Sequence, residues 1–583
     1  MRYPRIIKMS HIQTLIIFLI LGLLLTRCQP TQKKNKAQKD KPKTAHTVSV
    51  KDYGAIGDGI ADDTKSIQEA INATSSTNDT LLIPSGIYKI KTLVLRSNTK
   101  LKSVGLIRQH LPADTQFYGR YRQNSSSPLF FGRNLENIWL SFHAETRNEA
   151  VYIYNSKGIT ITNSTLAGNP KKLHAFPGLI FYNCQDISIS QSVIHSYGSP
   201  RLSARTYQSG TAIRFLTCQK INIQRNHLHH NGENGIFMHA SGYVHIERNR
   251  IEHNGMSGIQ IGFGKSKAEQ NYVIRYNLIR NNAADAIDIN NKITPQPLAI
   301  NCLIEHNRSA QNGFVRDTST VDGSGIATLV NVSKVRLYHN SSFHSNRPAI
   351  YLERCGLISS EHNETDAKIE IVGGFEQLEF AHNKFDALTL LTHTKGRKLR
   401  LDDNEMRTVL LPNQIAIDSL ILYRNLLRNA NLNLNFGGYF AFSNNTIQSK
   451  DQNGALLLIH LKKAEIKKNH ILNTASYGMI IRKNAQQVQI VANEIKALNA
   501  CIYDEGSENL SITENTLIAL PGGSVQRTVV SKNPNALKLS KNEHQGGKSD
   551  NSIKFEGEGT AFIGDEDIIS GYPDYGKIIV KPL

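Results

Sequence analysis

The sequence contains little cysteine, which limits the ways in which it can be cross-linked. Apart from Cys28 near the N-terminus, five cysteines are spread over the chain, at positions 184, 218, 302, 355 and 501. Their number is odd, and none of them has Cys-x-x-Cys spacing, so a disulfide framework and a zinc site are both disfavoured. We expect them to be small buried apolar residues.

The N-terminus has no apolar run long enough for a membrane-spanning helix. Leu15–Leu25 is an apolar stretch of 11 residues that follows Arg2, Arg5 and Lys8. A spanning helix needs about 20 apolar residues, whereas a basic segment followed by a shorter apolar one is typical of an export signal. We therefore expect the protein to act outside the cytoplasm.

The apolar stretch ends at "LTRC", residues 25–28, which resembles a bacterial lipoprotein box. This resemblance implies a signal peptide over 1–28, lipidation of Cys28 and attachment to the outer membrane. Residues 29–45 are lysine-rich without apolar periodicity and predict a flexible charged tether. The expected location is thus the periplasm or the cell surface, with an ordinary secreted protein as the alternative.

Acidic residues are too few to balance the basic ones, and the formal net charge is +20. The signal carries four of these charges and the tether a net five, which leaves about +11 on the remaining chain. A basic surface favours an anionic partner such as an acidic polysaccharide, although solubility alone would also explain it. No nucleic acid is expected, because an exported protein rarely meets it and no aromatic–basic recognition motif is present.

Helix-forming residues do not dominate the chain, and a short strand pattern recurs instead. An alternating apolar strand is followed by asparagine, any residue, and isoleucine or leucine, as in "INIQRNHL", "VHIERNRI" and "LSITENTL". The recurring asparagines are 163, 226, 249, 277, 307, 340, 363, 383, 404, 425, 445, 469, 493, 515 and 542, with Gln191 at one missing step. Their spacing of about 20 to 35 residues indicates a repeat architecture.

Short strands without helices in each repeat favour a parallel β-helix over a propeller, which needs longer periods and four strands per blade. Successive coils then stack at about 4.8 Å, and equivalent residues form ladders along the stack. An asparagine in a tight corner can bond the coils above and below it. We therefore predict structural roles for the recurring asparagines and an all-β fold.

The segment ahead of the repeats is "VKDYGAIGDGIADDTKSIQEAINA" (50–73), in which Asp62 or Asp63 precedes a short amphipathic helix, followed by "LLIPSGIYKI" (81–90). This pair resembles the opening of the pectate lyase superfamily. The resemblance implies a right-handed parallel β-helix with a short N-terminal helical cap. The expected divisions are cap and first coils at 46–100, β-helix at 101–545 and a closing segment at 546–583.

The repeats are widest between Gln191 and Asn340, where insertions fall at 196–210, 263–270, 291–298 and 313–323. Inserted loops commonly carry function, so this part of the wall is the expected working face. Aligning the strand after each insertion gives two outward columns. The first contains Arg214, Phe237, Gln260, Asp288, Ala327 and Tyr351, and the second Leu216, His239, Gly262, Asn290, Leu329 and Glu353.

The leading functional hypothesis is a lyase that cleaves an acidic, uronic-acid-containing polysaccharide by β-elimination, with a C5-epimerase as a related option. Elimination needs a neutralised carboxylate and a base for the C5 proton. The candidate catalytic residues are Asp288, His239, Arg214, Lys265 and Lys292. Gln260, Asn290, Tyr351 and Glu353 are expected to bind substrate, and Asp285 and Asp288 could hold Ca²⁺ through hard oxygen ligands.

Two alternatives remain open, and the sequence does not decide whether the protein is an enzyme. "ADAIDI" resembles the "NTDGID" stretch of the polygalacturonases, glycoside hydrolase family 28, which would place a catalytic carboxylate at Asp285; Asp288 and Glu353 could supply the second one. The other alternative is a non-catalytic surface lipoprotein that binds glycan or protein along the flat wall.

Overall fold

The structure, a computed structural model, describes residues 46–111, 125–171, 175–199, 209–264, 270–313, 324–345, 347–413, 415–533, 536–546, 553–555, 562–563 and 568–570. The expected signal, tether and lipidation site lie outside these residues, and so does Lys265. Within the described part, no helix combines the length and apolar character needed to cross a membrane.

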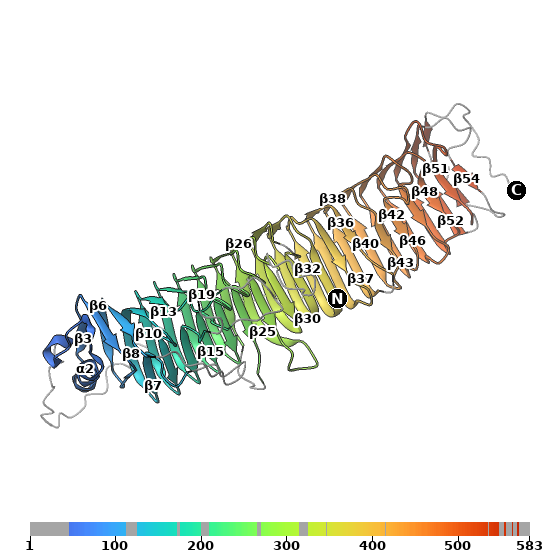
Figure 1. The fold of residues 1–583 in the computed structure, drawn as a ribbon. Coiled ribbons are helices and arrows are strands. Elements are labelled where there is room, and N and C mark those ends of the chain that lie inside the picture. The colour runs from blue at the N-terminus through green and yellow to red at the C-terminus, as the bar shows by residue number, and fades with distance from the viewer. Residues whose placement is uncertain are drawn as a thin grey trace, which may run out of the picture. The chain divides into compact units, whose positions relative to one another are not determined.

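The N-terminal elements are β1 (Thr47–Ser49), the 3-10 helix η1 (Val50–Tyr53), β2 (Asp58–Asp62) and α2 (Thr64–Thr77), and α2 lies at the blue end of the coil stack in Figure 1. α2 buries Ile67, Ala70 and Ile71 along one face. Asp63 precedes the helix but makes no side-chain cap bond; its carboxylate accepts the backbone N–H groups of the 56–57 turn at 2.6 and 3.1 Å. A capping role for α2 stays a prediction.

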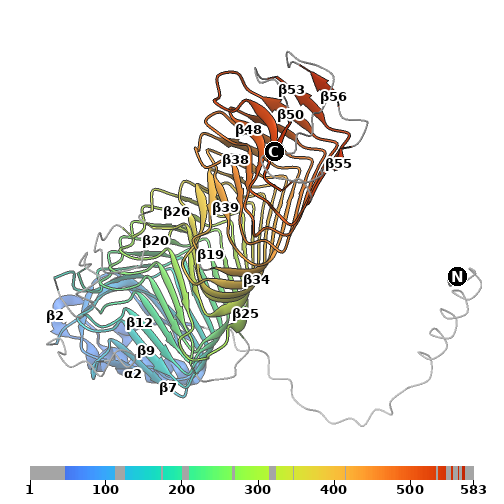
Figure 2. The ribbon, with the colours of Figure 1, turned by 90° about the vertical axis from the view of Figure 1, so that its right-hand side faces the viewer.

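Three short strands make each coil, and each strand pairs in parallel with its equivalent in the next coil. In one coil these are β15 (Ile213–Leu216), β16 (Gln219–Gln224) and β17 (His227–His229). They pair with β18 (Ile236–His239), β19 (Gly242–Glu247) and β20 (Arg250–Glu252). We call the three resulting stacks of strands the first, second and third rows (Figures 1 and 2).

The rows continue along the chain. The first row comprises β5 (Leu93–Val94), β7 (Phe130–Arg133), β9 (Val151–Tyr154), β12 (Leu179–Tyr182), β15, β18, β21 (Ile259–Gly262), β24 (Ile287–Asn290), β27 (Ala327–Val330), the starts of β30 (Ile350–Glu361) and β32 (Ile369–Ala381), β33 (Ala387–Leu390), β36 (Thr408–Leu410), β39 (Leu432–Leu434), β42 (Leu456–Leu458), β45 (Met479–Ile481), β48 (Ala500–Asp504), β51 (Arg527–Ser531) and β54 (Ile553–Phe555).

The second row comprises β3 (Thr80–Ile83), the starts of β6 (Lys100–Gln109) and β8 (Glu136–Glu145), β10 (Lys157–Thr162), β13 (Gln185–Ser190), β16, β19, β22 (Tyr272–Arg275), β25 (Leu298–Glu305), β28 (Val332–Tyr338), the ends of β30 and β32, β34 (Lys395–Asp402), β37 (Ala416–Tyr423), β40 (Tyr439–Ser443), β43 (Lys463–Lys467), β46 (Gln487–Val491), β49 (Asn509–Thr513), β52 (Leu537–Ser540) and β55 (Phe562–Ile563).

The third row comprises β4 (Ile87–Ile90), the ends of β6 and β8, β11 (Thr165–Ala167), β14 (Val193–His195), β17, β20, β23 (Leu278–Arg280), β26 (Arg308–Ala310), β29 (Ser341–Phe343), β31 (Glu364–Thr365), β35 (Glu405–Met406), β38 (Leu426–Arg428), β41 (Thr446–Ser449), β44 (His470–Asn473), β47 (Glu494–Ala497), β50 (Thr516–Ala519), β53 (Glu543–Gln545) and β56 (Ile568–Ser570). β54, β55 and β56 extend all three rows into the segment expected to close the fold.

Aliphatic side chains fill the interior of the stack, so the structure confirms an all-β parallel solenoid. The expected role of the cysteines is also confirmed. All five outside the N-terminal segment are free thiols in the buried interior, at positions 184, 218, 302, 355 and 501.

The recurring asparagines form a continuous buried ladder from Asn226 to Asn542. At each step the side-chain oxygen accepts both the backbone N–H and the side-chain amide of the asparagine one coil earlier, as from Asn404 to Asn425 at 2.9 and 3.0 Å. The same amide also donates to a backbone carbonyl, in this case that of Phe380 at 2.8 Å. Every corner in this stretch therefore has its polar groups paired.

The first two assignments to this ladder were wrong. Asn163 is exposed and Gln191 lies beside it in the equivalent corner, and both have left-handed backbone angles, with φ of 47° and 51°. The neighbouring Ser164 and Ser192 occupy the ladder position, and the Ser164 N–H donates to the Ser192 hydroxyl at 3.2 Å. A serine hydroxyl accepts the same backbone proton, which is why the asparagine pattern slips by one residue there.

Candidate functional site

The first row places most of the expected site residues in two outward columns, as the alternation of strand residues requires. Arg214, Phe237, Gln260 and Asp288 are consecutive partners, and Leu216, His239, Gly262 and Asn290 are the partners in the second column. The wide connections reach this row from both edges: 196–212 and 311–326 precede its strands, whereas 263–271 and 291–297 follow them. The expected working face therefore consists of the outward residues of the first row in these coils.

The register differs from the expectation at β27. Asp288 pairs with Thr328, and Asn290 pairs with Val330, so Ala327 and Leu329 are not in the outward columns. Both are fully buried. A slip of one residue exchanges the two faces of a strand, and this register buries Leu329 instead of a threonine hydroxyl. Tyr351 and Glu353 remain in the outward columns, two coils beyond Asp288 and Asn290.

Arg214 is not available to a substrate carboxylate. Its side chain is 1% exposed and its guanidinium donates to Glu233, which is fully buried, at 2.5 Å. The guanidinium also donates to Thr211 at 3.1 Å and stacks on the Phe237 ring at 4.8 Å. Removing one partner of a buried pair is costly because the other charge is left uncompensated, so Arg214 has a structural role here.

Asp288 points outward but is covered, and the expectation that it is exposed was wrong. Its carboxylate is 7% exposed and accepts a hydrogen bond from Gln260 at 2.8 Å. The Gln260 oxygen in turn accepts from Asn234 at 3.1 Å, and Asn234 donates to Glu233 at 3.4 Å. A buried polar chain thus joins coils and fixes the orientation of the Asp288 carboxylate.

Asp285 holds a corner. Its side chain is 2% exposed and accepts the backbone N–H of Ser324 at 2.7 Å and the hydroxyl of Thr328 at 2.6 Å. Both donors come from the next coil, across the insertion at 313–323. The carboxylate therefore stabilises the coil that carries β27, and the expected alternative role as a hydrolase carboxylate has no support from this geometry.

Asp285 and Asp288 are the residues expected to hold calcium. One oxygen of each carboxylate accepts a hydrogen bond, from Ser324 to Asp285 and from Gln260 to Asp288. Among the described residues, no group of three or more histidine, cysteine, aspartate or glutamate side chains could hold a metal ion. Calcium dependence stays a prediction, and no step below depends on it.

His239, Gly262 and Asn290 form a gap in the second column, which we call the notch. Gly262 has no side chain, and a Cβ there would lie 3.5 Å from Nδ1 of His239. A Cβ on Gly264 would lie 3.5 Å from Nε2. His239 and Asn290 are two coil steps apart, about 10 Å, and the His239 imidazole lies over the glycine backbone between them.

The groups at the edges of the notch can act on a bound ring. His239 is half-buried, and burial lowers its pKa below the usual value of 6.5, which favours the neutral imidazole. The Asn290 side-chain oxygen is buried and accepts no hydrogen bond from any described residue. Asp288 lies in the adjacent column beside Asn290.

The remaining expected residues lie at the margin. Lys292 is exposed just beyond β24. Tyr351 is 9% exposed, and burial, followed by the charge of Glu353, raises its pKa to about 12. Its hydroxyl donates to Glu353 at 3.5 Å, and Glu353 also pairs with Arg354 at 3.0 Å. Tyr351 and Glu353 are two coils from Asn290 and could contact a longer polysaccharide.

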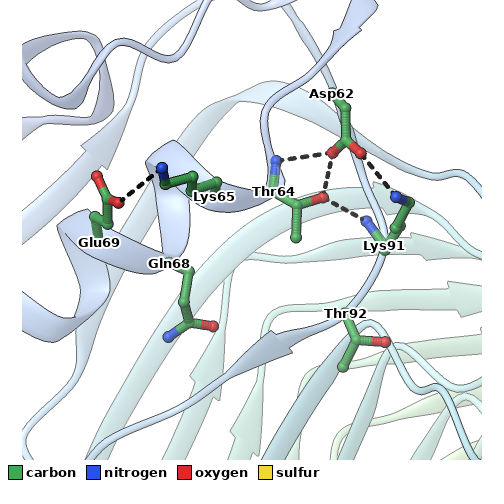
Figure 3. Close-up of a pocket in the computed structure, with 7 residues that line it drawn as sticks. All are labelled: Asp62, Thr64, Lys65, Gln68, Glu69, Lys91 and Thr92. Atoms are coloured by element: carbon green, nitrogen blue, oxygen red, sulfur yellow. Dashed lines mark hydrogen bonds and ion pairs between the residues drawn. The ribbon is translucent and has the colours of Figure 1, made fainter.

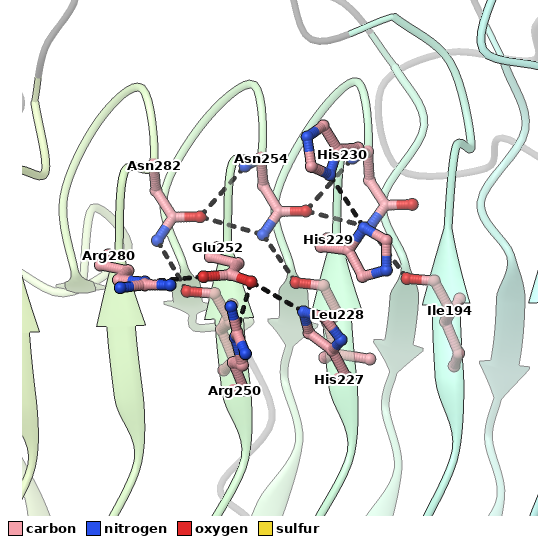
Figure 4. A network of polar contacts seen from close by, with 12 residues as sticks. Ile194, His227, Leu228, His229, His230, Arg250, Glu252, Asn254, Arg280 and Asn282 are labelled. Carbon is pink, nitrogen blue, oxygen red and sulfur yellow. Dashed lines mark hydrogen bonds and ion pairs between the residues drawn. The ribbon is translucent and has the colours of Figure 1, made fainter.

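Sequence reasoning missed a histidine cluster on the third row. Figure 4 shows His227, His229 and His230 beside Glu252, which accepts from His227 at 2.9 Å. Burial and the neighbouring His227 lower the pKa of His229 to about 4. Glu252 also pairs with Arg250 and Arg280 at 2.6 and 2.7 Å, so its charge is already balanced.

A second asparagine ladder lies beside this cluster and was also missed. It runs through Asn231, Asn254, Asn282 and Asn312, with amide-to-oxygen distances of 2.9 to 3.0 Å. Figure 4 labels Asn254 and Asn282. Each member follows a first-ladder asparagine by five residues, and this spacing is the signal that could have revealed it.

A shallow pocket beside α2 carries no functional site. Figure 3 shows that Asp62, Thr64 and Lys91 satisfy one another: Asp62 accepts from the Thr64 backbone and pairs with Lys91, both at 3.1 Å. The Thr64 hydroxyl also accepts the Lys91 N–H at 3.0 Å. The arrangement ties α2 to the first coils.

Two known protein families match parts of this chain. Residues 149–322 match the family described as "Right handed beta helix region", and residues 47–197 match "Rhamnogalacturonase A/epimerase, pectate lyase-like". The protein is thus a right-handed parallel β-helix. The match over residues 47–197 confirms the resemblance to the pectate lyase superfamily.

Individual relatives match only short segments. Plasmin and fibronectin-binding protein A of Streptococcus pneumoniae (strain ATCC BAA-255 / R6) is 47% identical over 58 residues, which are 9% of this chain and 8% of that protein. Mannuronan C5-epimerase AlgE2 of Azotobacter vinelandii is 36% identical over 67 residues, 10% of this chain and 7% of that protein. The chain therefore spans less than a tenth of the length of these curated relatives.

A solved structure of an exopolygalacturonase from Thermotoga maritima covers 65% of this chain and 92% of its own, at 13% identity and a TM-score of 0.36.

Proposed function

We propose that the protein is an exported, carbohydrate-active enzyme that acts on an acidic polysaccharide, and that it cleaves a uronic-acid-containing chain by β-elimination at the notch. The observation that carries this proposal is the half-buried His239 imidazole beside Gly262, which has no side chain, with Asp288 and Asn290 in the next coil of the same wall. The match to a family named for a rhamnogalacturonase and an epimerase supports a carbohydrate substrate.

Elimination assigns a role to each group at the notch. Neutral His239 takes the C5 proton, and the electron pair forms the C4–C5 double bond as the C4–oxygen bond breaks. The leaving oxygen needs a proton, which is supplied by water or by the Asp288 carboxyl group in its protonated form. The substrate carboxylate must be balanced by a cation. Arg214 is already paired with Glu233, so exposed Lys292 is the remaining described candidate.

Hydrolysis is the second candidate reaction, and the carboxylate arrangement favours it less. An inverting hydrolase needs two carboxylates about 6.5–9.5 Å apart. Asp285 and Glu233 are engaged in buried contacts, whereas Glu353 lies two coil steps along from Asn290, at about 10 Å. A lyase needs one base beside the ring, which the notch supplies.

A panel of polysaccharides tests the reaction. The chain from residue 46 is incubated with polygalacturonate, alginate and other uronic-acid polymers, and ultraviolet absorbance of unsaturated ends is measured beside new reducing ends. Both signals rising together support elimination. Reducing ends without absorbance mean hydrolysis. Neither signal, with retained binding, means a non-catalytic role, as the name of the plasmin- and fibronectin-binding relative would suggest.

We also propose that the protein is anchored outside the cytoplasm through lipidated Cys28. The support is the sequence "LTRC" after a short apolar stretch. Cells expressing the full chain should incorporate radiolabelled fatty acid into the protein, and Cys28→Ser should abolish the label. A wild-type chain that takes up no label contradicts the anchor and leaves ordinary secretion.

A further inference from the structure

A group of aromatic side chains on the first row has no part in the elimination step. β7, β9 and β12 pair in register, and their outward residues include Phe131, Tyr152, Tyr154 and Tyr182. We call these four side chains the aromatic platform. The inward residues of the same strands supply the core, so the platform rings are not needed to fill the interior.

The rings of the platform lie against one another on the outer wall. The centroids of Phe131 and Tyr152 are 5.9 Å apart, and those of Tyr152 and Tyr154 are 5.8 Å apart with an interplanar angle of 23°. Tyr182 continues the column of Tyr154 into the next coil. The rings of Phe131, Tyr152 and Tyr154 thus form one contiguous group, and Tyr182 follows in the next coil.

The platform remains open to solvent in the described structure. Tyr182 is 38% exposed, and Phe131, Tyr152 and Tyr154 are half-buried. None of the three tyrosine hydroxyls hydrogen-bonds to a described residue. Buried tyrosines normally find such a partner, so these hydroxyls are free to bond a ligand.

A basic group borders the aromatic platform. Arg133 is exposed in the same column as Tyr154, and its guanidinium carbon lies 5.3 Å from the Tyr154 ring centroid. This cation–π contact holds the guanidinium beside the rings while leaving its donors to meet a carboxylate or sulfate. In contrast to Arg214, Arg133 has no ion pair within the described chain.

We propose that the aromatic platform is a stacking subsite for an acidic glycan, with Arg133 binding an acid group of the sugar. The C–H faces of sugar rings pack on flat aromatic side chains, while the tyrosine hydroxyls bond sugar oxygens at the edges. The inference rests on the proposed function for the identity of the ligand, which is the same polysaccharide that the notch cleaves.

The register explains how one chain can reach both places. From Tyr154 the second column passes through Tyr182 and Leu216 to His239, which is three coil steps, or roughly 14 Å. A polysaccharide that contacts the platform and the notch together must therefore pass over Leu216, which is 6% exposed. A short oligosaccharide that only fills the notch does not.

The test compares binding and turnover in the full chain. Tyr152→Leu/Tyr154→Leu keeps apolar bulk but removes the flat rings, Tyr154→Phe keeps the ring, and Tyr276→Ala removes a tyrosine that is 45% exposed on the second-row side. Affinity for polygalacturonate and alginate is measured by electrophoresis through gels that contain the polymer. We expect the double variant to bind at least about tenfold more weakly, a loss of about 1.4 kcal/mol. Tyr276→Ala should bind like the wild type, and Tyr154→Phe, which keeps the ring but loses one hydroxyl, should bind more tightly than the double variant.

The outcomes separate this inference from the proposed reaction. Weaker binding in the double variant supports the platform even if no polymer is cleaved. Unchanged binding in a folded double variant, or no binding of either polymer by the wild type, overturns it. Cleavage with platform-independent binding overturns the platform and leaves the proposed reaction intact. Matching thermal unfolding of the variants shows that the fold is kept.

Discussion

His239 depends on two glycines for its access to a ligand. Because a Cβ on Gly262 or Gly264 would contact the imidazole at 3.5 Å, larger side chains at these positions would cover the ring. Burial lowers the imidazole pKa below its usual value. A lowered pKa suits a base, which must be neutral to accept a proton.

A base with this pKa sets the pH dependence of cleavage. The imidazole acts only when deprotonated, and burial lowers its pKa below 6.5, so kcat/KM should fall with decreasing pH only below 6.5. His239→Gln should reduce kcat/KM by at least about 100-fold and remove this acid limb. A variant that keeps the wild-type pH profile contradicts the assignment of His239 as base.

Asp288 provides a matched pair of charge substitutions. Asp288→Asn keeps the side-chain shape beside Gln260 and removes the charge, and we expect turnover to fall by at least about 100-fold. Asp418→Asn is the control, since Asp418 is exposed in β37, far along the stack from the notch. Equal turnover of both variants, or unfolding of both, would show that the site is elsewhere.

The outward direction of the site side chains could be predicted from the sequence, but their burial could not. Strand alternation alone puts Arg214, Gln260 and Asp288 on the outside. The burial of Arg214 and Asp288 depends on contacts with residues of neighbouring coils, which follow no sequence period. Glu233 shows the same limit, because nothing in its local sequence identifies it as the buried partner of Arg214.

At the scale of the element, the corner ladder joins neighbouring coils. Asn404→Ala removes the amide that bonds Asn425 and the Phe380 carbonyl, and it also removes the acceptor for Asn383. Each buried group left without a partner costs about 1–3 kcal/mol, so we expect a clear loss of stability in chemical denaturation.

Asn163→Gly is the control for this substitution. Asn163 is exposed, outside the ladder, and has a φ of 47° that glycine adopts without strain. Its stability should remain close to that of the wild type. Equal destabilisation by both substitutions would mean that the ladder bonds contribute no more than an exposed corner residue.

The coils were predictable because one signal repeats through the chain. The asparagine followed by an apolar residue marks the same corner from Asn226 to Asn542, so each repeat supports the others. The register of β27 was not predictable, because the 313–323 insertion gives no count of residues to the next corner. Asp285 fixes that register through Ser324 and Thr328, which is a contact between coils and not a local preference.

At the scale of the whole molecule, histidines that stay neutral when folded make stability depend on pH. His544 is fully buried beside Thr528, and burial lowers its pKa to about 4. The unfolded chain takes up this proton near the usual 6.5, whereas the folded chain does so only near 4. Stability should therefore be full above pH 6.5 and fall progressively between 6.5 and 4.

Replacing His544 tests this linkage. His544→Gln removes the titrating group, so the loss of stability between pH 7 and pH 5 should be smaller than in the wild type. His46→Gln, at an exposed position, should leave the slope unchanged. The measurement is chemical denaturation at several pH values. A wild-type slope in the His544 variant would assign the pH dependence to other groups.

The buried thiols can be used to detect which part of the coil stack opens first. Since Cys184, Cys218, Cys302, Cys355 and Cys501 are free and enclosed at intervals along it, an alkylating reagent can reach each one only when its own coil opens. The order in which they react would reveal whether the solenoid frays from its ends or separates in the middle. Reducing agents, in contrast, should leave the stack unchanged, because no cross-link between these residues contributes to its stability.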